Sequence, residues 1–119
     1  FGASAFGYVL MVTTVCFLDD IERSFREVHR ILENGGSFIV GFIDRRSRLG
    51  RYYLEHKSGN VFYREAQFYS KKEISRIMRK TGFENLEFSG IVIDKNKKVK
   101  KIGRVEGASF LVIKGHKVK

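Results

Sequence analysis

Residues 6–43 contain the pattern that most constrains the fold of this chain. They read FGYVLMVTTVCFLDDIERSFREVHRILENGGSFIVGFI: an apolar run, a polar turn, an amphipathic stretch, a Gly-Gly stop and a second apolar run. Strands that are apolar on both faces are typical of parallel sheets, whose faces are covered. A helix that connects two such strands forms a right-handed βαβ unit. The pattern therefore predicts parallel strands over residues 8–13 and 37–43, joined by a helix.

The connecting helix is predicted from its start signal, its apolar stripe and its stop signal. Asp19 and Asp20 suit a helix start, where acidic side chains meet the positive end of the helix dipole. Residues 34–36, Asn-Gly-Gly, tolerate positive φ and are predicted to end the helix. Between them, apolar residues recur at helical spacing and predict a buried stripe of Ile21, Phe25, Val28 and Leu32.

The C-terminal part predicts a helix followed by an antiparallel hairpin. Residues 70–73, Ser-Lys-Lys-Glu, form a capping-box pattern, and Gly82 closes the helix that it opens. An imperfect alternation over residues 86–92 indicates an edge strand, whereas the apolar run over residues 108–113 indicates an interior strand. The last strand is therefore expected to insert between the first strand of the hairpin and the parallel pair. The fold class is α/β, with a mixed sheet of about four strands and helices packed on it.

Length and composition fit one globular domain. The chain has 119 residues, of which 43% are hydrophobic, so it can bury a core. No apolar run approaches the ~18 residues of a membrane span, and the first residues lack the basic region of a signal peptide. We therefore expect no membrane segment and a cytoplasmic location.

A basic stretch precedes the last predicted strand. The net charge is +10, and residues 94–104, DKNKKVKKIGR, carry five lysines and one arginine against a single aspartate. One interpretation is a solvated hairpin loop. The other is a nucleic-acid-binding or scaffold module that uses residues 95–104. The run contains no aromatic residue, so stacking on bases is not indicated.

Residues 6–40 resemble the second half of the class I S-adenosylmethionine-dependent methyltransferase domain. That family runs F-D-x-V-L, then an apolar turn, then D-x-x-x-x-L-x-E-x-x-R-V-L-K-P-G-G and a hydrophobic strand. This chain matches the pattern in register without a gap, through Phe6-Gly7-Tyr8-Val9-Leu10, Asp20, Phe25, Glu27, Arg30-Ile31-Leu32 and Gly35-Gly36. Residues 68–83 are similar to the helix that precedes the family's final hairpin.

The resemblance implies a partial Rossmann-like three-layer fold in which residues 1–119 form one domain, equivalent to the C-terminal half of the methyltransferase domain. It implies S-adenosylmethionine as cofactor and an unidentified methyl acceptor. In the family, a Gly-rich loop and two acidic residues of the first half hold most of the cofactor. No G-x-G occurs in this sequence. We therefore expect this isolated chain to have weak methyltransferase activity or none.

The resemblance also assigns candidate site residues after the first predicted strand. Met11, Val12 and Thr13 are assigned to the cofactor side. Thr14, Cys16 and Phe17 are assigned to the acceptor side, although Cys16 and Phe17 could instead be core residues. Methyl transfer from a sulfonium is a direct displacement that needs alignment more than a strong acid or base. A nucleophilic cysteine would need an activating base, and none is expected near Cys16. No catalytic residue is therefore assigned.

Further candidates follow the second predicted strand. Asp44 lies where open α/β sheets bind ligands. Arg45 begins an arginine-rich stretch that could clamp an acidic acceptor, or form a solvated cluster around a short helix. Tyr52 is one of several aromatic residues that could line an acceptor pocket or seal the core. His29, His56 and His116 lack the spacing of metal ligands.

The first strand also predicts a partner. In the family fold residues 8–13 would form an interior strand, but here nothing in the sequence supplies a neighbour for their outer edge. An exposed apolar edge promotes association. We therefore expect a second copy to cover it in a homodimer.

Overall fold

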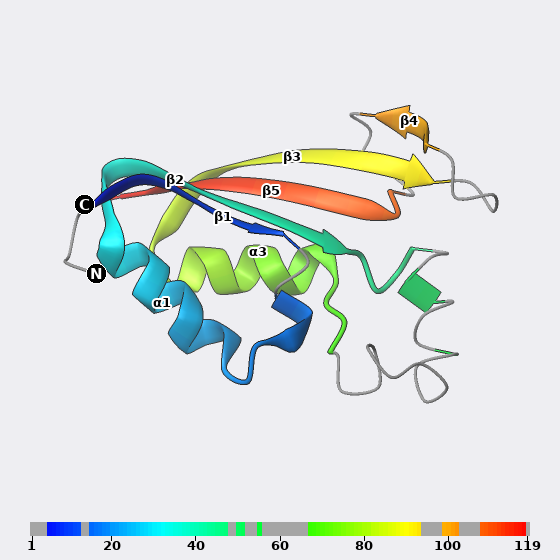
Figure 1. Ribbon diagram of the computed structural model, residues 1–119, viewed down its shortest axis with the longest axis horizontal. Helices are drawn as coiled ribbons and strands as arrows, with labels where there is room; N and C mark the ends of the chain where they lie inside the picture. Colours follow the sequence, from blue (N-terminus) through cyan, green and yellow to red (C-terminus); the bar gives the residue numbers. More distant parts are fainter. Residues whose placement is uncertain are drawn as a thin grey trace.

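The computed structural model describes residues 5–12, 15–47, 50–51, 55, 67–93, 99–102 and 108–118 (Figure 1). Within these residues a five-stranded sheet has the order β1-β2-β5-β3-β4. The chain order is β1 (Phe6–Val12), η1 (Val15–Phe17), α1 (Ile21–Ile31), β2 (Leu32–Ile43), α3 (Lys71–Lys80), β3 (Phe83–Ile93), β4 (Val99–Ile102) and β5 (Phe110–Lys117).

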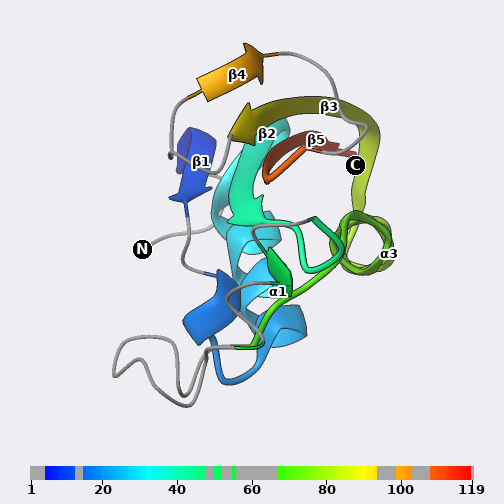
Figure 2. The same ribbon diagram turned by 90° about the vertical axis from the view of Figure 1, so that its right-hand side faces the viewer.

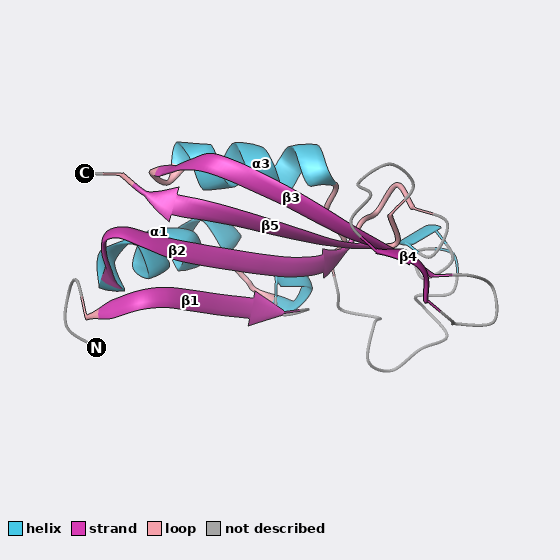
Figure 3. Ribbon diagram, turned by 90° about the horizontal axis from the view of Figure 1, so that it is seen from above, coloured by secondary structure: helices cyan, strands magenta, loops and turns pink. Residues whose placement is uncertain are grey.

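The strand pairing confirms the predicted mixed sheet. β1 and β2 are parallel, whereas β5 is antiparallel to both β2 and β3. β5 therefore lies inside the sheet, inserted between β2 and β3 as expected (Figure 3). The four-residue strand β4 was not expected, and it pairs with the end of β3. β3 is consequently an edge strand only before residue 91.

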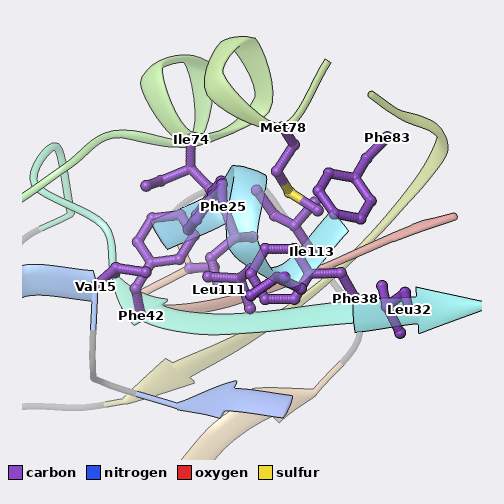
Figure 4. Packing of buried hydrophobic residues seen from close by; sticks show 13 residues of the cluster. Val15, Phe25, Leu32, Phe38, Phe42, Ile74, Met78, Phe83, Leu111 and Ile113 are labelled. Carbon is purple, nitrogen blue, oxygen red and sulfur yellow. The ribbon is translucent and has the colours of Figure 1, made fainter. Parts of the chain in front are cut away.

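Helices α1 and α3 lie against the same face of the sheet (Figures 1 and 2). The core between them and the strands is rich in phenylalanine: Phe25 and Phe38 meet edge to face with ring centroids 4.9 Å apart, and Phe38 lies 5.1 Å from Phe83. Such aromatic pairs add to the free energy gained by burial. Figure 4 shows Ile74 and Met78 of α3 packing onto these rings. The described helices thus form a second layer on one face of the sheet.

Helix α1 begins as predicted. Asp20 is its N-cap, and its carboxylate accepts a hydrogen bond from the backbone N–H of Arg23. The predicted stripe faces the sheet, with Phe25, Val28 and Leu32 buried. The N-cap and the apolar spacing therefore confirm this part of the prediction.

The predicted end of α1 is wrong. The helix ends at Ile31, and residues 34–36 belong to β2, which starts at Leu32 rather than at residue 37. The Ile31 carbonyl accepts a hydrogen bond from the N–H of Ala5, and Leu32 pairs with Phe6 of β1. Because Leu32 pairs with β1, the helix ends and the strand begins three residues before Gly35.

Helix α3 carries the predicted capping box. The Ser70 hydroxyl accepts a hydrogen bond from the Glu73 backbone N–H, and the Glu73 carboxylate accepts one from the Ser70 N–H. The helix ends at Lys80, and Gly82 follows with φ +102°. Both boundary signals in the sequence therefore act where they were expected.

Strand β1 lies at the edge of the described sheet and packs on one face only. Val9 and Met11 pack against the core, whereas Tyr8, Leu10 and Val12 are 69%, 60% and 46% exposed. These alternating faces follow from the two-residue period of a strand. The apolar pattern on both sides of β1 thus leaves one apolar row uncovered.

No helix among the described residues is long and apolar enough to cross a membrane. The expected cytoplasmic location stays a prediction.

Candidate functional site

The carboxyl ends of β1 and β2 lie at the same end of the sheet. The strands are parallel, with Met11 opposite Val40 and Val12 opposite Gly41. Asp44 follows directly after β2. Figure 2 looks onto this end of the molecule. Open α/β sheets bind their ligands outside the carboxyl ends of parallel strands, so this is the candidate site.

The residues predicted for the cofactor side do not share one face. Met11 is half-buried and packs against the core, whereas Val12 is exposed on the opposite face. Thr13 lies outside the described residues. The alternation of side chains along a strand separates neighbours in this way. Whether Met11 and Val12 bind a cofactor stays a prediction.

An apolar contact that the sequence did not reveal lies beside Val12. A β-carbon placed on Gly41 would lie 2.9 Å from Cζ of Phe110 and 3.8 Å from Cγ1 of Val12. The missing side chain at Gly41 therefore allows the Phe110 ring to lie over β2. In the sequence, the glycine within the apolar run SFIVGFI could have indicated that a side chain packs over the strand at Gly41. Which side chain does so depends on the register between β2 and β5.

The turn η1 places its two apolar end residues in different environments. Val15 is buried, whereas Phe17 is 51% exposed. The interpretation of Phe17 as a core residue is therefore wrong, because Val15 occupies the core in its place. Thr14 and the side chain of Cys16 lie outside the described residues. Phe17 remains the described candidate for acceptor contact in this turn.

Asp44 organises the turn after β2. Its carbonyl accepts hydrogen bonds from the N–H and the hydroxyl of Ser47, at 3.0 and 2.7 Å. Its Oδ1 accepts the Arg46 N–H at 2.9 Å. Gly50 closes the turn, and a β-carbon there would lie 2.0 Å from the Asp44 carbonyl oxygen. The Arg46 N–H holds the half-buried Asp44 carboxylate, and none of the ion pairs between described residues includes it.

The arginine predicted beside Asp44 has a structural partner. The Arg45 guanidinium forms an ion pair with Glu73 at 2.9 Å, and Glu73 also caps α3. Both side chains are partly exposed, so the pair contributes little stability, about 0–1 kcal/mol. An acceptor clamp by Arg45 would have to compete with Glu73. Tyr52 lies outside the described residues.

Two histidines occupy defined places away from this end. His29 of α1 stacks edge-on against Phe83 with ring centroids 5.4 Å apart. His116 of β5 shares a 3.2 Å hydrogen bond between its Nδ1 and the Ser37 hydroxyl, and its Nε2 lies 3.8 Å from Glu87. No cluster of three or more metal-ligating side chains occurs among the described residues.

Comparisons of the sequence and of the structure relate this chain to the same class of protein. A family model described as a methyltransferase domain matches residues 1–40. The crystal structure of a Thermotoga maritima SAM-dependent methyltransferase, described as a possible histamine N-methyltransferase, is 39% identical with a TM-score of 0.92. It aligns with 98% of this chain and 58% of its own.

Two further matches extend the comparison. An uncharacterized protein of Methanocaldococcus jannaschii is 33% identical over 116 residues, which are 95% of this chain and 57% of the relative. A chain from the complex between the Haloferax volcanii Trm112 methyltransferase activator and the putative methyltransferase has a TM-score of 0.74 at 15% identity, covering 100% of this chain and 57% of that chain. The latter likeness concerns the fold alone.

The predicted resemblance to class I S-adenosylmethionine-dependent methyltransferases is therefore confirmed, and the Thermotoga maritima protein is described as SAM-dependent. The chain spans just over half the length of the relatives that it matches.

Proposed function

We propose that this chain forms the acceptor side of an S-adenosylmethionine-dependent methyltransferase that acts on a small molecule. One observation carries the proposal: the parallel strands β1 and β2 end together beside Asp44, within a fold that matches the Thermotoga maritima methyltransferase. As a unit, residues 1–119 would correspond to the C-terminal half of the domain.

The described residues fit part of the cofactor. Met11 and Val12 would contact it with apolar side chains at the carboxyl end of β1. When bound, the cofactor supplies a methyl group on a sulfonium. The residues of this chain would align the acceptor for a direct displacement, which depends chiefly on orientation. Because the sequence has no G-x-G, we expect the isolated chain to bind the cofactor weakly.

The acceptor that we propose is a small amine. The Asp44 carboxylate is held by the Arg46 N–H without a cationic partner among the described residues, so it can accept a hydrogen bond from an amine. The Thermotoga maritima neighbour is described as a possible histamine N-methyltransferase, which supports the same substrate class. Arg45 and Arg46, which follow Asp44 in the sequence, would suit an acidic acceptor, and the experiment below separates the two.

Cofactor binding is tested by titrating the ¹⁵N-labelled chain with S-adenosylhomocysteine to millimolar concentration. We expect shifts in the backbone amides of Met11, Val12 and Phe17, with a dissociation constant near 1 mM, about −4 kcal/mol. Adenosine and homocysteine alone serve as controls and should shift fewer of these amides. If millimolar S-adenosylhomocysteine shifts none of these amides, the proposed cofactor binding at the carboxyl end of β1 is contradicted.

Acceptor binding is tested in the same spectra with histamine and, separately, with a dicarboxylate such as succinate. Histamine should shift the amides of Asp44 and Arg46, and Asp44→Asn should weaken its binding about tenfold, because the charged hydrogen bond is lost. The matched control is Asp19→Asn, an exposed aspartate away from β2. Succinate binding that Asp44→Asn strengthens would instead establish an acidic acceptor.

A further inference from the structure

The turn after β2 is held in its shape by its own hydrogen bonds. Asp44 accepts the N–H of Arg46 on its carboxylate at 2.9 Å and the N–H of Ser47 on its carbonyl at 3.0 Å. Ser47 accepts the Gly50 N–H on its hydroxyl and the Arg51 N–H on its carbonyl, both at 2.9 Å. These bonds join residues of one short segment. They therefore fix how the turn is folded, but not where it lies relative to the neighbouring elements.

Bonds to other segments determine where the turn lies. The Asp44 N–H donates to the Ser109 carbonyl, just before β5, at 3.1 Å. The Arg45 N–H donates to the Tyr69 carbonyl, just before α3, at 2.9 Å. The Arg45 guanidinium adds a third link, because its Nη2 lies 2.9 Å from Oε1 of Glu73. The two backbone bonds do not depend on the side chain at position 45, whereas the link to Glu73 does.

Helix α3 is a rigid support for this third link. Ile74 and Met78 anchor the helix in the core, since both side chains are fully buried (Figure 4). The Glu73 carboxylate is itself held at the helix start, because its Oε1 also accepts the Ser70 N–H at 3.1 Å. Site residues are placed most accurately when the groups that support them are locked by packing and hydrogen bonds. Glu73 meets this condition, so its ion pair with Arg45 ties the turn to a fixed element.

We propose that Arg45 is a positioning residue for the acceptor: by pairing with Glu73 it holds the Asp44 carboxylate at the end of the parallel strands. The inference rests on the proposed function, in which Asp44 binds a small amine. Accurate placement matters for methyl transfer, since a displacement of about 1 Å can slow an aligned reaction about a hundredfold. Glu73 also compensates the positive charge of Arg45, which would otherwise oppose an amine beside Asp44.

Amide hydrogen exchange in the free chain tests the link without any ligand. Glu73→Gln retains the capping box, which accepts either residue, but removes the negative charge that faces Arg45. The Arg45 amide, bonded to the Tyr69 carbonyl, should then exchange about threefold faster, within the roughly fivefold by which an exposed ion pair changes an equilibrium. The Gly50 amide, bonded within the turn, should exchange at the wild-type rate. An unchanged Arg45 amide, or an equal acceleration at Gly50, overturns the proposal.

Histamine titration tests whether the link matters for the acceptor. Arg45→Gln should bind histamine about threefold more weakly than Arg51→Gln, the matched control, in which an exposed arginine at the end of the same turn loses the same charge. Arg45→Lys should restore the wild-type affinity, because an ammonium group can pair with the same carboxylate. If Arg45→Gln binds histamine as tightly as Arg51→Gln does, the proposal is overturned.

The two measurements also separate this inference from the function on which it rests. If the wild-type chain binds no histamine but the Arg45 amide responds to Glu73→Gln as expected, the amine acceptor is wrong and the positioning of Asp44 by Arg45 stands. If the chain binds histamine and the Arg45 amide does not respond, the amine acceptor stands and the positioning role is wrong.

Discussion

Gly82 is the residue at which backbone conformation and a neighbouring side chain together restrict the sequence. Its φ is +102°, and a β-carbon there would lie 2.6 Å from Nε2 of His29. We expect Gly82→Ala to lower the free energy of unfolding by strain, about 1–2 kcal/mol, and by displacement of the His29 ring. Urea unfolding measures the loss.

Gly35→Ala is the control for the strain alone. Gly35 also has positive φ, at +79°, but nothing lies within 4 Å of a β-carbon placed on it. The Gly82 variant should therefore be less stable than the Gly35 variant by about 1–2 kcal/mol. Equal losses at the two positions would show that the His29 ring moves aside without cost.

His29 should make the stability of the fold sensitive to acid. Burial lowers the pKa of His29 below its ordinary value of 6.5, the charge of Lys117 lowers it further, and a hydrogen bond with the backbone of Val118 opposes these effects. A lowered folded-state pKa means that the neutral ring stabilises the fold. This contribution is complete above the unfolded-state pKa and is lost as the pH falls through the lower folded-state value.

Urea unfolding between pH 8 and pH 5 measures this effect in the wild-type chain and in His29→Gln, which cannot titrate. We expect the wild-type chain to lose stability relative to the variant as the pH falls below about 6.5. A wild-type chain that gains stability relative to His29→Gln in acid would reverse the sign and contradict the prediction.

At the residue scale, the sequence predicts candidates but not contacts. Asp44 was predicted from its position after a strand, and the structure places it at the end of the parallel pair. The contact of Phe110 with Gly41 was not predicted, because these residues meet only in one register of β2 and β5. The pairing of Arg45 with Glu73 likewise joins segments that the sequence separates by a long connection. Predicting contacts between distant segments requires the pairing register of the strands, which a single sequence does not specify.

At the element scale, helix α3 depends on a local signal at its start. Ser70 is buried, and its hydroxyl and the Glu73 carboxylate satisfy each other's backbone N–H groups. Ser70→Ala should lower the free energy of unfolding by about 1 kcal/mol. Ser89→Ala on the exposed face of β3 is the control and should change it by less than about 0.5 kcal/mol. Urea unfolding that shows equal stability for both variants would mean that the capping box contributes nothing.

Helix starts were predicted correctly and the end of α1 was not, for a physical reason. A capping side chain acts within three residues, so Asp20 and Ser70 could be read from the sequence alone. The end of α1 is determined instead by hydrogen bonds from Ala5 to Ile31 and by pairing of Phe6 with Leu32. Pairing with β1 therefore overrides the preference of Gly35 and Gly36 for a helix end.

At the scale of the whole molecule, charge and apolar surface are separated across the sheet. The order β1-β2-β5-β3-β4 places the uncharged strand at one edge and the lysine-bearing strand at the other. Helices α1 and α3 lie on one face, whereas Tyr8, Leu10 and Val12 are exposed on the other. The pattern of apolar residues predicted β1, β2, β3, β5 and their order but not β4, whereas the exposed face of β1 follows from the position of α1 and α3.

The net charge of +10 should make stability increase with salt. Twenty-three basic residues stand against 13 acidic ones, and exposed ion pairs such as that of Arg45 with Glu73 contribute little. Screening weakens the mutual repulsion of the excess positive charges, so the urea midpoint should rise between about 0.02 and 0.3 M NaCl. Lys72→Glu, at an exposed position of α3, lowers the net charge by two and should reduce this rise. Lys72→Arg keeps the charge and should retain it. A midpoint that falls with salt would show instead that attraction in the ion pairs exceeds the repulsion.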